Sequence, residues 1–290
     1  MVPEPTRLWP DTATILERSR GVFFAQWDEL LRLRRAVIKT ATLNDIHDLR
    51  VASRRFRAVL ELFYPFAPKG PKTDVRKNVR TLTRNLGGLR NIDEALLFFP
   101  SRVQGEVNPE NKLSRALSKL RSRELKRMKR TLKAFDHRTL DRMVREIVAG
   151  VNENALSGRN SLSLPAYFSE VSVRQYLPIH QLLAGSTLPD HRIARHSLRI
   201  AIKKWRYFFE IISLILDRDY APVVEQLKHY QSLLGQMNDI SEFSVLLGTL
   251  KLSRCERKSA EAALVAEDAV LLENFTNLSE RNPLTYAFLI

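Results

Sequence analysis

Apolar side chains recur every three or four residues along most of the chain, which is the spacing of one face of an α-helix. A clear example is the stripe that begins with Leu49, Ala52 and Phe56. No segment alternates apolar and polar residues between hairpin turns, so the pattern predicts an all-α protein. The predicted helices cover residues 15–38, 45–64, 75–86, 95–99, 111–135, 166–183, 190–216, 220–234, 240–250 and 255–275.

Breaks in the apolar pattern predict where the chain is divided. The pair Gly87-Gly88 follows the stripe of the third helix and is expected to end it. Residues 151–165 (VNENALSGRNSLSLP) are rich in Asn, Ser and Gly and lack an apolar period, which indicates a linker or a long loop. We therefore predict two domains, residues 1–157 and residues 158–290.

The two halves of the chain resemble each other. Residues 46–63 read IHDLRVASRRFRAVLELF, and residues 195–212 read RHSLRIAIKKWRYFFEII, at an offset of 149 positions. Residues 86–92 (LGGLRNI) match residues 234–240 (LGQMNDI) at an offset of 148 positions. A repeat of this length predicts two similar helical bundles packed around a pseudo-twofold axis.

Basic residues share one face of the repeated helix, within about 80° of one another, because they follow steps of three, four and three residues. A merely soluble face usually mixes charges of both signs, whereas each of these ridges stacks like charges. We interpret both as ligand-binding ridges that face away from their own core; solvated faces are the alternative. The first ridge comprises His47, Arg50, Arg54 and Arg57. The second ridge comprises His196, Arg199, Lys203 and Arg206.

Further basic stripes lie on the neighbouring predicted helices of the first half. If the helices pack side by side, these stripes merge with the ridges into a basic central groove. In the second half Lys228 remains, but Glu225 and Ser232 stand at the positions that match Lys77 and Arg84. An asymmetric groove is therefore an open alternative. The long helix carries Lys112, Arg115, Lys119, Arg123, Lys126, Arg130 and Lys133, and the third helix carries Lys77, Arg80 and Arg84.

Composition adds a strong positive charge. The 290 residues include 47 Lys and Arg against 32 Asp and Glu, a formal net charge of +15 at pH 7. Clustered basic side chains release condensed counterions when they meet a phosphate chain, so this excess favours a polyanionic partner. The single cysteine, Cys255, excludes an intramolecular disulfide and zinc sites built on paired cysteines. Without a signal-like start or a long apolar run, we expect a soluble, cytoplasmic protein with no cofactor.

The histidine motifs resemble those of a known family. Residues 47–57 (HDLRVASRRFR) and residues 196–206 (HSLRIAIKKWR), each followed by an L-G-x-x-[RN]-[ND] element, resemble the CHAD family, the conserved histidine α-helical domain. The resemblance covers residues 15–275. It implies a pair of antiparallel four-helix bundles whose basic surface binds inorganic polyphosphate, without catalysis by the domain, and an association with polyphosphate granules. The chain lacks an E-x-E-x-K signature, so we expect a stand-alone copy.

The resemblance also implies roles for the basic residues. Arginine offers a bidentate fork to phosphate oxygens, and lysine a point charge. We expect a bound polyanion to raise the pKa of both ridge histidines and to couple binding to proton uptake near neutral pH. No residue is assigned to catalysis or to a metal. The candidate polyphosphate-binding residues are His47, Arg50, Arg54, Arg55, Arg57, Lys77, Arg80, Arg84, Arg115, Lys119, Arg123, Lys126, Arg130, His196, Arg199, Lys203, Lys204, Arg206 and Lys228.

Two departures from the family pattern fall in the second half. Ser197 stands where the first half has Asp48, and lysines replace Arg54 and Arg55. Whether both halves contribute equally is therefore open. The L-G-x-x-[RN]-[ND] elements have two interpretations. In the structural one a glycine ends one helix and the Asn or Asp starts the next; in the functional one Arg90 contacts ligand while the Asn and Asp orient arginines.

Three other functions are alternatives to polyphosphate binding. The pair His47-Asp48 resembles that of metal-dependent phosphohydrolases, but no earlier histidine supplies the further ligand. Nucleic-acid binding suits the charge equally well and is the main alternative, although the ridges lack the interleaved aromatic residues of single-strand binders. Weak nucleic-acid binding is expected in either case. A scaffold for protein partners would need an exposed apolar patch, and residues 284–290 (LTYAFLI) are expected to pack back onto the bundle.

Overall fold

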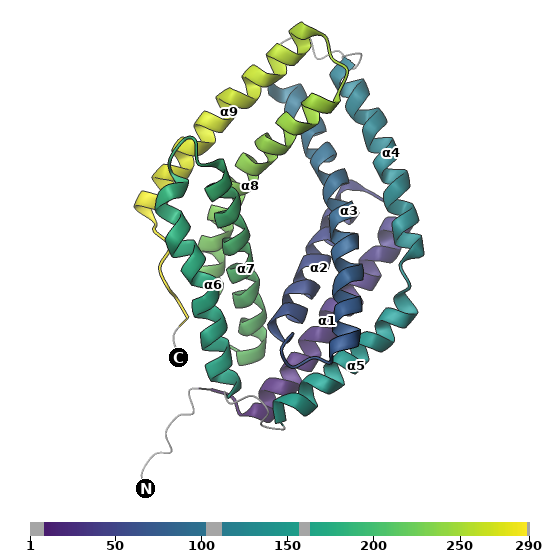
Figure 1. The fold of residues 1–290 in the computed structure, drawn as a ribbon, viewed down its shortest axis with the longest axis vertical. Coiled ribbons are helices and arrows are strands. Elements are labelled where there is room, and N and C mark those ends of the chain that lie inside the picture. Colours follow the sequence, from purple (N-terminus) through teal and green to yellow (C-terminus); the bar gives the residue numbers. More distant parts are fainter. Residues whose placement is uncertain (1–8, 103–111, 157–162, 289–290) are drawn as a thin grey trace.

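The computed structural model describes residues 9–102, 112–156 and 163–288, and this part of the chain is helical with no β-strand, as predicted (Figure 1). The helices are α1 (Thr12–Lys39), α2 (Leu43–Leu62), α3 (Lys69–Arg102), α4 (Lys112–Ala134), α5 (His137–Leu156), α6 (Leu164–Ser186), α7 (Arg192–Leu216), α8 (Ala221–Thr249) and α9 (Arg254–Arg281).

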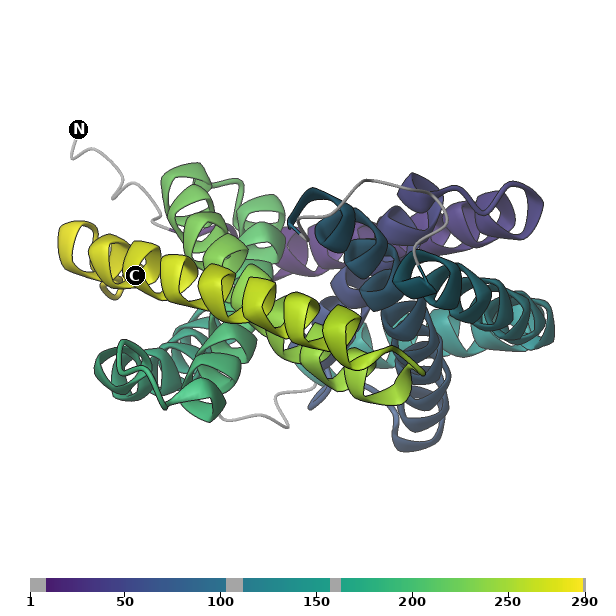
Figure 2. The same ribbon diagram turned by 90° about the horizontal axis from the view of Figure 1, so that it is seen from above.

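Helices that follow one another in the sequence pack against one another in each half. In the first half α1 packs on α2, α2 on α3 and α3 on α4; in the second half α6 packs on α7, α7 on α8 and α8 on α9. The remaining helix, α5, packs on α3 and α1. The two sets lie side by side, purple to teal and green to yellow (Figure 2). The described helices thus follow the order of the internal repeat, with α5 as an additional helix in the first half.

The two halves share one hydrophobic core and meet along their repeated helices. Within that core, buried apolar residues from both halves form one continuous cluster. Across the boundary α7 packs against α1 and α2, and α8 packs against α3. The predicted domain boundary, between residues 157 and 158, lies at the edge of residues 157–162, outside the described residues. The packing of α2 against α7 brings together the two helices that carry the histidine motifs.

Two predicted breaks are wrong, because long helices run through the glycine elements. Helix α3 continues past Gly87 and Gly88, and α8 continues past Gly235. A glycine inside a helix costs about 1 kcal/mol relative to alanine. Burial of the apolar stripe on either side offsets this cost, because each buried aliphatic or aromatic side chain contributes about 1.5–3 kcal/mol. The buried stripe of α3 includes Leu86, Leu89, Ile92, Ala95 and Phe99, and that of α8 includes Leu234, Met237, Ile240, Phe243 and Leu247.

The predicted linker also starts too early. Helix α5 extends to Leu156, and Val151 is buried together with Val144, Ile147 and Val148 on its apolar stripe. The Asn-rich end of this helix is anchored as well, because the Asn154 side chain donates a hydrogen bond to the Phe66 carbonyl at 2.7 Å. Tertiary contacts therefore stabilise a helix where the local composition favours a loop.

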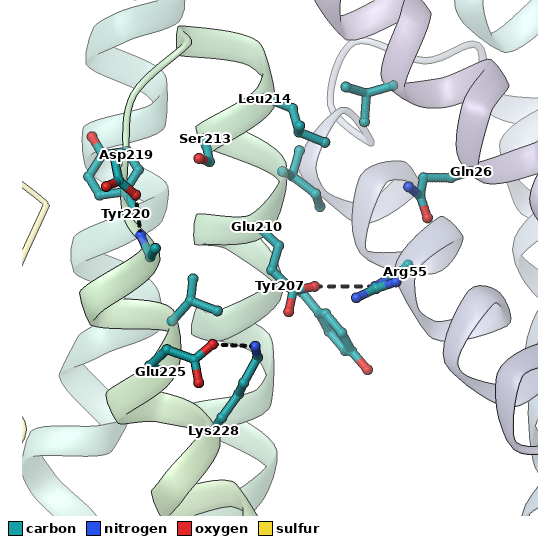
Figure 3. A pocket seen from close by; sticks show the side chains of 14 residues that line it. Gln26, Arg55, Tyr207, Glu210, Ser213, Leu214, Asp219, Tyr220, Glu225 and Lys228 are labelled. Carbon is teal, nitrogen blue, oxygen red and sulfur yellow. Dashed lines mark hydrogen bonds and ion pairs between the residues drawn. The ribbon is translucent and has the colours of Figure 1, made fainter.

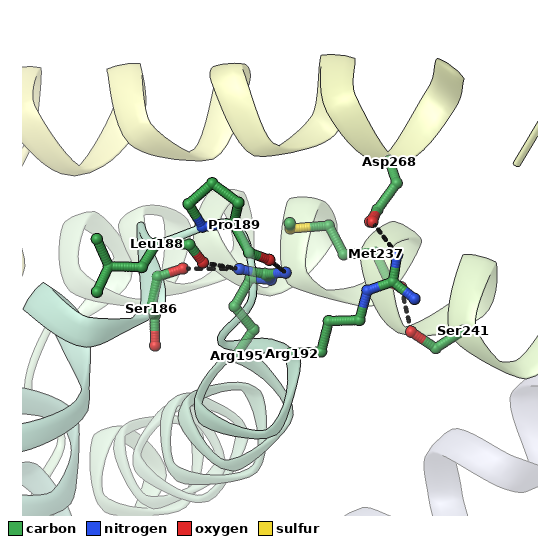
Figure 4. A network of polar contacts seen from close by, with 8 residues as sticks. All are labelled: Ser186, Leu188, Pro189, Arg192, Arg195, Met237, Ser241 and Asp268. Carbon is green, nitrogen blue, oxygen red and sulfur yellow. Dashed lines mark hydrogen bonds and ion pairs between the residues drawn. The ribbon is translucent and has the colours of Figure 1, made fainter. Parts of the chain in front are cut away.

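Arginines fix the start of α7 and so position its ridge (Figure 4). The Arg195 guanidinium donates to the carbonyls of Leu188 and Pro189, at 2.6 and 2.8 Å, and closes the turn between α6 and α7. Arg192 donates to Asp268 at 2.7 Å and ties α7 to α9. Both arginines are used structurally, which leaves the residues further along α7 for other roles.

The C-terminal segment packs back onto the second half, as predicted for the part that the structure describes. Leu284 and Phe288 are buried, and the Tyr176 hydroxyl donates to the Leu284 carbonyl at 3.2 Å. Residues 289–290 lie outside the described residues.

Candidate functional site

The two basic ridges face each other where α2 packs against α7. Burial lowers the pKa of Lys203 to about 7, and Arg54 on α2 is the largest electrostatic contributor to the same shift. Burial likewise lowers the pKa of Arg50 to about 9, with Arg54 and then Arg199 on α7 acting in the same direction. We call this group the central cluster and define it as Arg50, Arg54 and Arg57 of α2 with Arg199, Lys203 and Arg206 of α7.

The central cluster is partly buried and leaves polar atoms without partners. All of its side chains are intermediate in exposure. The Nε atoms of Arg50, Arg57, Arg199 and Arg206 are buried, and none of the described residues supplies a hydrogen-bond acceptor to them. Buried donors in native proteins are nearly always paired, with protein, water or a ligand. Unpaired Nε atoms and the mutual repulsion of the guanidinium groups raise the free energy of the unliganded protein, and an anion relieves this cost.

Few carboxylates offset the positive charge. Burial raises the pKa of Asp239 on α8, while Arg199 and Arg50 act in the opposite direction by stabilising its charged form. Glu210 lies at one edge, where its carboxylate is 3.4 Å from Arg206 Nη1 and 3.3 Å from Arg55 Nε. Asp239 is thus a partly buried carboxylate in electrostatic contact with cations of both halves.

The two histidines have different neighbours. His196 Nδ1 lies 2.8 Å from Asn238 Oδ1, which places a proton on Nδ1 because the amide oxygen only accepts. His47 is exposed, and partial desolvation followed by the charge of Arg90 lowers its pKa. Arg90 and Asn238 occupy equivalent positions in the repeat. A bound polyanion would act on the pKa of His47 in the opposite direction to these arginines. The proton uptake on binding stays a prediction.

The L-G-x-x-[RN]-[ND] elements lie inside α3 and α8, beside the ridges. The interpretation that their glycines end helices is wrong. A Cβ at Gly235 would lie 3.9 Å from Arg199 Nε, an ordinary van der Waals contact, so this glycine lies directly beside the central cluster. Asn91 donates to Glu242 of α8 at 3.0 Å and thereby links the halves, and Arg90 forms an ion pair with Glu94 on its own helix.

The whole chain was compared with known proteins. A family model described as the CHAD domain matches residues 21–248. The chain belongs to the CHAD domain family. A crystal structure of the CHAD domain from the plant Ricinus communis covers 94% of the chain and 93% of its own, with a TM-score of 0.73 at 21% identity. The structure of PptA from Streptomyces chartreusis aligns over 92% of this chain and 99% of its own, with a TM-score of 0.59 at 16% sequence identity. No curated protein matches the chain significantly.

Both structural matches establish the fold of this CHAD domain, which is the all-α fold predicted from its sequence. None of the helices in the described residues is both long and apolar enough to cross a membrane.

Several predicted site residues of this CHAD domain lie outside the central cluster. Lys77, Arg80 and Arg84 are exposed on α3, and Lys204 is exposed on α7. Helix α4, which packs on α3 and α1, exposes all of its predicted ridge. The exposed side chains of that ridge, which we call the α4 ridge, are Lys112, Arg115, Lys119, Arg123, Lys126, Arg130 and Lys133.

Two predicted site residues, Arg55 and Lys228, instead line a mixed-charge pocket of about 450 Å³ between the halves (Figure 3). Each forms an ion pair with a carboxylate there: Arg55 with Glu210 at 3.3 Å, and Lys228 with Glu225 at 2.5 Å. Tyr207 also lines this pocket. The surroundings of Arg55 and Lys228 therefore differ from the concentrated positive charge of the central cluster.

The sequence left two interpretations of Asp239 open, and the structure places this residue beside cations of both halves of this CHAD domain. This position is the one that the functional interpretation requires, in which the Asn and Asp orient arginines. The available signal was the mismatch within the repeat, since Asp239 replaces Asn91 and so adds one charge to an otherwise matching segment. The sequence pattern assigned no role to Tyr207, whose ring packs against the Arg206 guanidinium at 4.8 Å.

Proposed function

We propose that this protein binds inorganic polyphosphate at the central cluster. The carrying observation is that two cationic ridges from different halves face each other, partly buried, with unpaired guanidinium nitrogens. Such a site raises the free energy of the unliganded protein. A ligand that brings several negative charges to neighbouring positions removes this penalty.

The chemistry of the central cluster suits phosphate groups. The guanidinium groups supply N–H donors in a fixed fork that matches phosphate oxygens, and they remain charged at neutral pH. Lys203 supplies a compact ammonium whose charged form a phosphate chain would stabilise. A linear polymer of phosphates can reach the donors of α2 and those of α7 at the same time.

Aromatic packing favours polyphosphate over nucleic acid as the ligand. Trp205 is 1% exposed and donates its ring N–H toward Ser172, and Tyr207 is 5% exposed. Single-stranded nucleic acid gains about 1–3 kcal/mol per base by stacking on exposed rings. These rings are buried beside the ridge and offer no such platform. The α4 ridge is exposed, and we expect it to bind RNA or DNA weakly and with a strong salt dependence.

We further propose that binding is not accompanied by catalysis and that it brings the protein to polyphosphate granules. The surroundings of His47 support a binding role: desolvation lowers its pKa, and the charges of Arg90, Arg50 and Arg54 act in the same direction. The imidazole lies among groups that attract an anion, and its ring N–H can donate a hydrogen bond to that anion.

A salt titration of binding tests the identity of the ligand. Long-chain polyphosphate is titrated into the protein at several salt concentrations, with single-stranded RNA and duplex DNA as competitors. We expect polyphosphate to be retained at physiological salt while both nucleic acids are displaced. Equal affinity for the three polymers would overturn the proposal and would reduce the protein to a general cation.

A further inference from the structure

The cations of α3 extend the central cluster on the α2 side. Lys77, Arg80 and Arg84 follow steps of three and four residues, so they share one face of α3 and span about 10 Å along it. Helix α3 packs on α2, and the Thr83 hydroxyl donates to Ser53 at 3.0 Å, which places this stretch of α3 beside the α2 side of the cluster. Arg80 and Arg76 also help to lower the pKa of Arg57. We call Lys77, Arg80 and Arg84 the α3 arm.

The α3 arm is exposed and carries its full charge. All of its side chains are exposed, and no carboxylate among the described residues forms an ion pair with any of them. The nearby Glu61 is engaged by Arg76, whose Nε lies 2.7 Å from its carboxylate. The arm therefore continues the positive surface from the central cluster into solvent.

The equivalent positions on α8 carry no net charge. At the offset of 148 positions, Glu225, Lys228 and Ser232 replace Lys77, Arg80 and Arg84. Lys228 Nζ lies 2.5 Å from Glu225 Oε1, and this hydrogen bond is the main reason why the pKa of Glu225 is lowered. Figure 3 shows this pair on the wall of the mixed-charge pocket, opposite the pair formed by Arg55 and Glu210.

We propose that a polyphosphate chain held by the central cluster continues over the α3 arm and not over α8, so that the α3 arm determines the preference for long chains. This inference rests on the proposed function. A short phosphate, such as tripolyphosphate, occupies the central cluster alone. A longer chain gains additional contacts, but only in the direction where the surface is positive.

The repeat supplies a matched pair of variants for the test. Arg80 and Lys228 are equivalent positions, both exposed, and each is changed to glutamine. Binding of tripolyphosphate and of long-chain polyphosphate is measured for both variants across a salt series. Arg80→Gln is expected to weaken long-chain binding about three- to tenfold and to reduce its salt slope by about 1, while tripolyphosphate binding is unchanged. Lys228→Gln is expected to leave both ligands unaffected.

The remaining outcomes contradict either the path over the α3 arm or the proposed function. Equal losses of long-chain affinity in Arg80→Gln and Lys228→Gln would overturn the directional path, as would a loss of tripolyphosphate binding equal to that of the long chain in Arg80→Gln. Failure of the unmodified protein to bind either phosphate would instead overturn the proposed function itself. A third variant, Glu225→Gln, frees Lys228 and is expected to increase long-chain affinity; no increase would count against the assigned role of this ion pair.

Discussion

Lys203 on α7 and Arg54 on α2 occupy equivalent positions of the internal repeat, and they are close enough for their positive charges to repel each other. After burial, Arg54 contributes most to the lowered pKa of Lys203. Arg50 and Arg199 are a second equivalent pair in the same relationship. The repeat thus brings like charges together at the contact between the halves, which is unfavourable for the unliganded fold and favourable for an anion.

The first prediction concerns stability and pH. The pKa of Lys203 is about 7 in the folded protein and 10.5 in its ordinary state. Below about pH 7 the amine is charged in both states, and the folded protein bears the full repulsion. Between about pH 7 and 10.5 only the unfolded chain keeps the proton, so stability rises with pH. Lys203→Met is therefore expected to raise the free energy of unfolding at pH 7 by about 1–2 kcal/mol.

Urea unfolding at about pH 6.5 and about pH 9 checks this prediction. The difference between the variant and the unmodified protein should shrink at the higher pH. Lys204→Met is the control, since this exposed neighbour should change stability by less than about 0.5 kcal/mol. Parallel pH profiles for Lys203→Met and the unmodified protein would show that Lys203 does not bear the repulsion.

The second prediction concerns proton uptake on binding. The pKa values of Lys203 and His47 are lowered in the unliganded protein, and polyphosphate bound as proposed would stabilise the charged forms of both. Binding near pH 7 should take up about half a proton or more per site, and affinity should fall as the pH rises above about 7. Calorimetry in two buffers of different ionisation enthalpy measures the uptake. Lys203→Arg should keep the affinity but lose most of the uptake, and equal heats in both buffers would contradict the prediction.

The third prediction concerns the partly buried carboxylate of the site. Asp239 is the anion that Arg50 and Arg199 contact electrostatically before a ligand arrives, so it competes with phosphate. Asp239→Asn should raise polyphosphate affinity about three- to tenfold and lower the free energy of unfolding at low salt by about 1–3 kcal/mol. Asn91→Asp, at the equivalent position, adds a carboxylate and should weaken binding. If Asp239→Asn weakened binding instead, the carboxylate would be positioning the arginines rather than competing with phosphate.

The fold and the ridges could be predicted from the sequence because both depend on periodic patterns. The spacing of Arg50, Arg54 and Arg57 fixes their common face on α2, and the repeat assigns the same geometry to α7. Periodicity defines a face of a helix but not what lies opposite that face. For this reason the sequence predicted ridges that face away from their own cores and merge into a basic central groove, but it did not specify which ridge lies opposite which. The packing of α2 on α7 brings the two ridges together.

The unpredicted features are those in which tertiary packing overrides a local preference. Gly87 and Gly88 favour a helix end, but the buried stripe of α3 continues through Leu89 and Ile92. Lys228 matches a basic position of the first half, yet its charge is offset by Glu225, three residues earlier on the same helix. The continuation of α3 through its glycines depends on the neighbouring core, and the pairing of Lys228 with Glu225 depends on side-chain rotamers. A residue pattern alone determines neither of them.

The most direct test compares the central cluster with the α4 ridge at equal loss of charge. One variant carries Arg50→Gln, Arg54→Gln, Arg199→Gln and Lys203→Gln; the other carries Lys119→Gln, Arg123→Gln, Lys126→Gln and Arg130→Gln. Affinity for long-chain polyphosphate is measured at physiological salt after circular dichroism has shown that both variants are folded. We predict a loss of at least about 100-fold in the first variant, from four charge-assisted contacts, and a loss below about tenfold in the second. Equal losses in the two variants would contradict the account, because polyphosphate would then be reading net charge rather than the meeting of the two ridges.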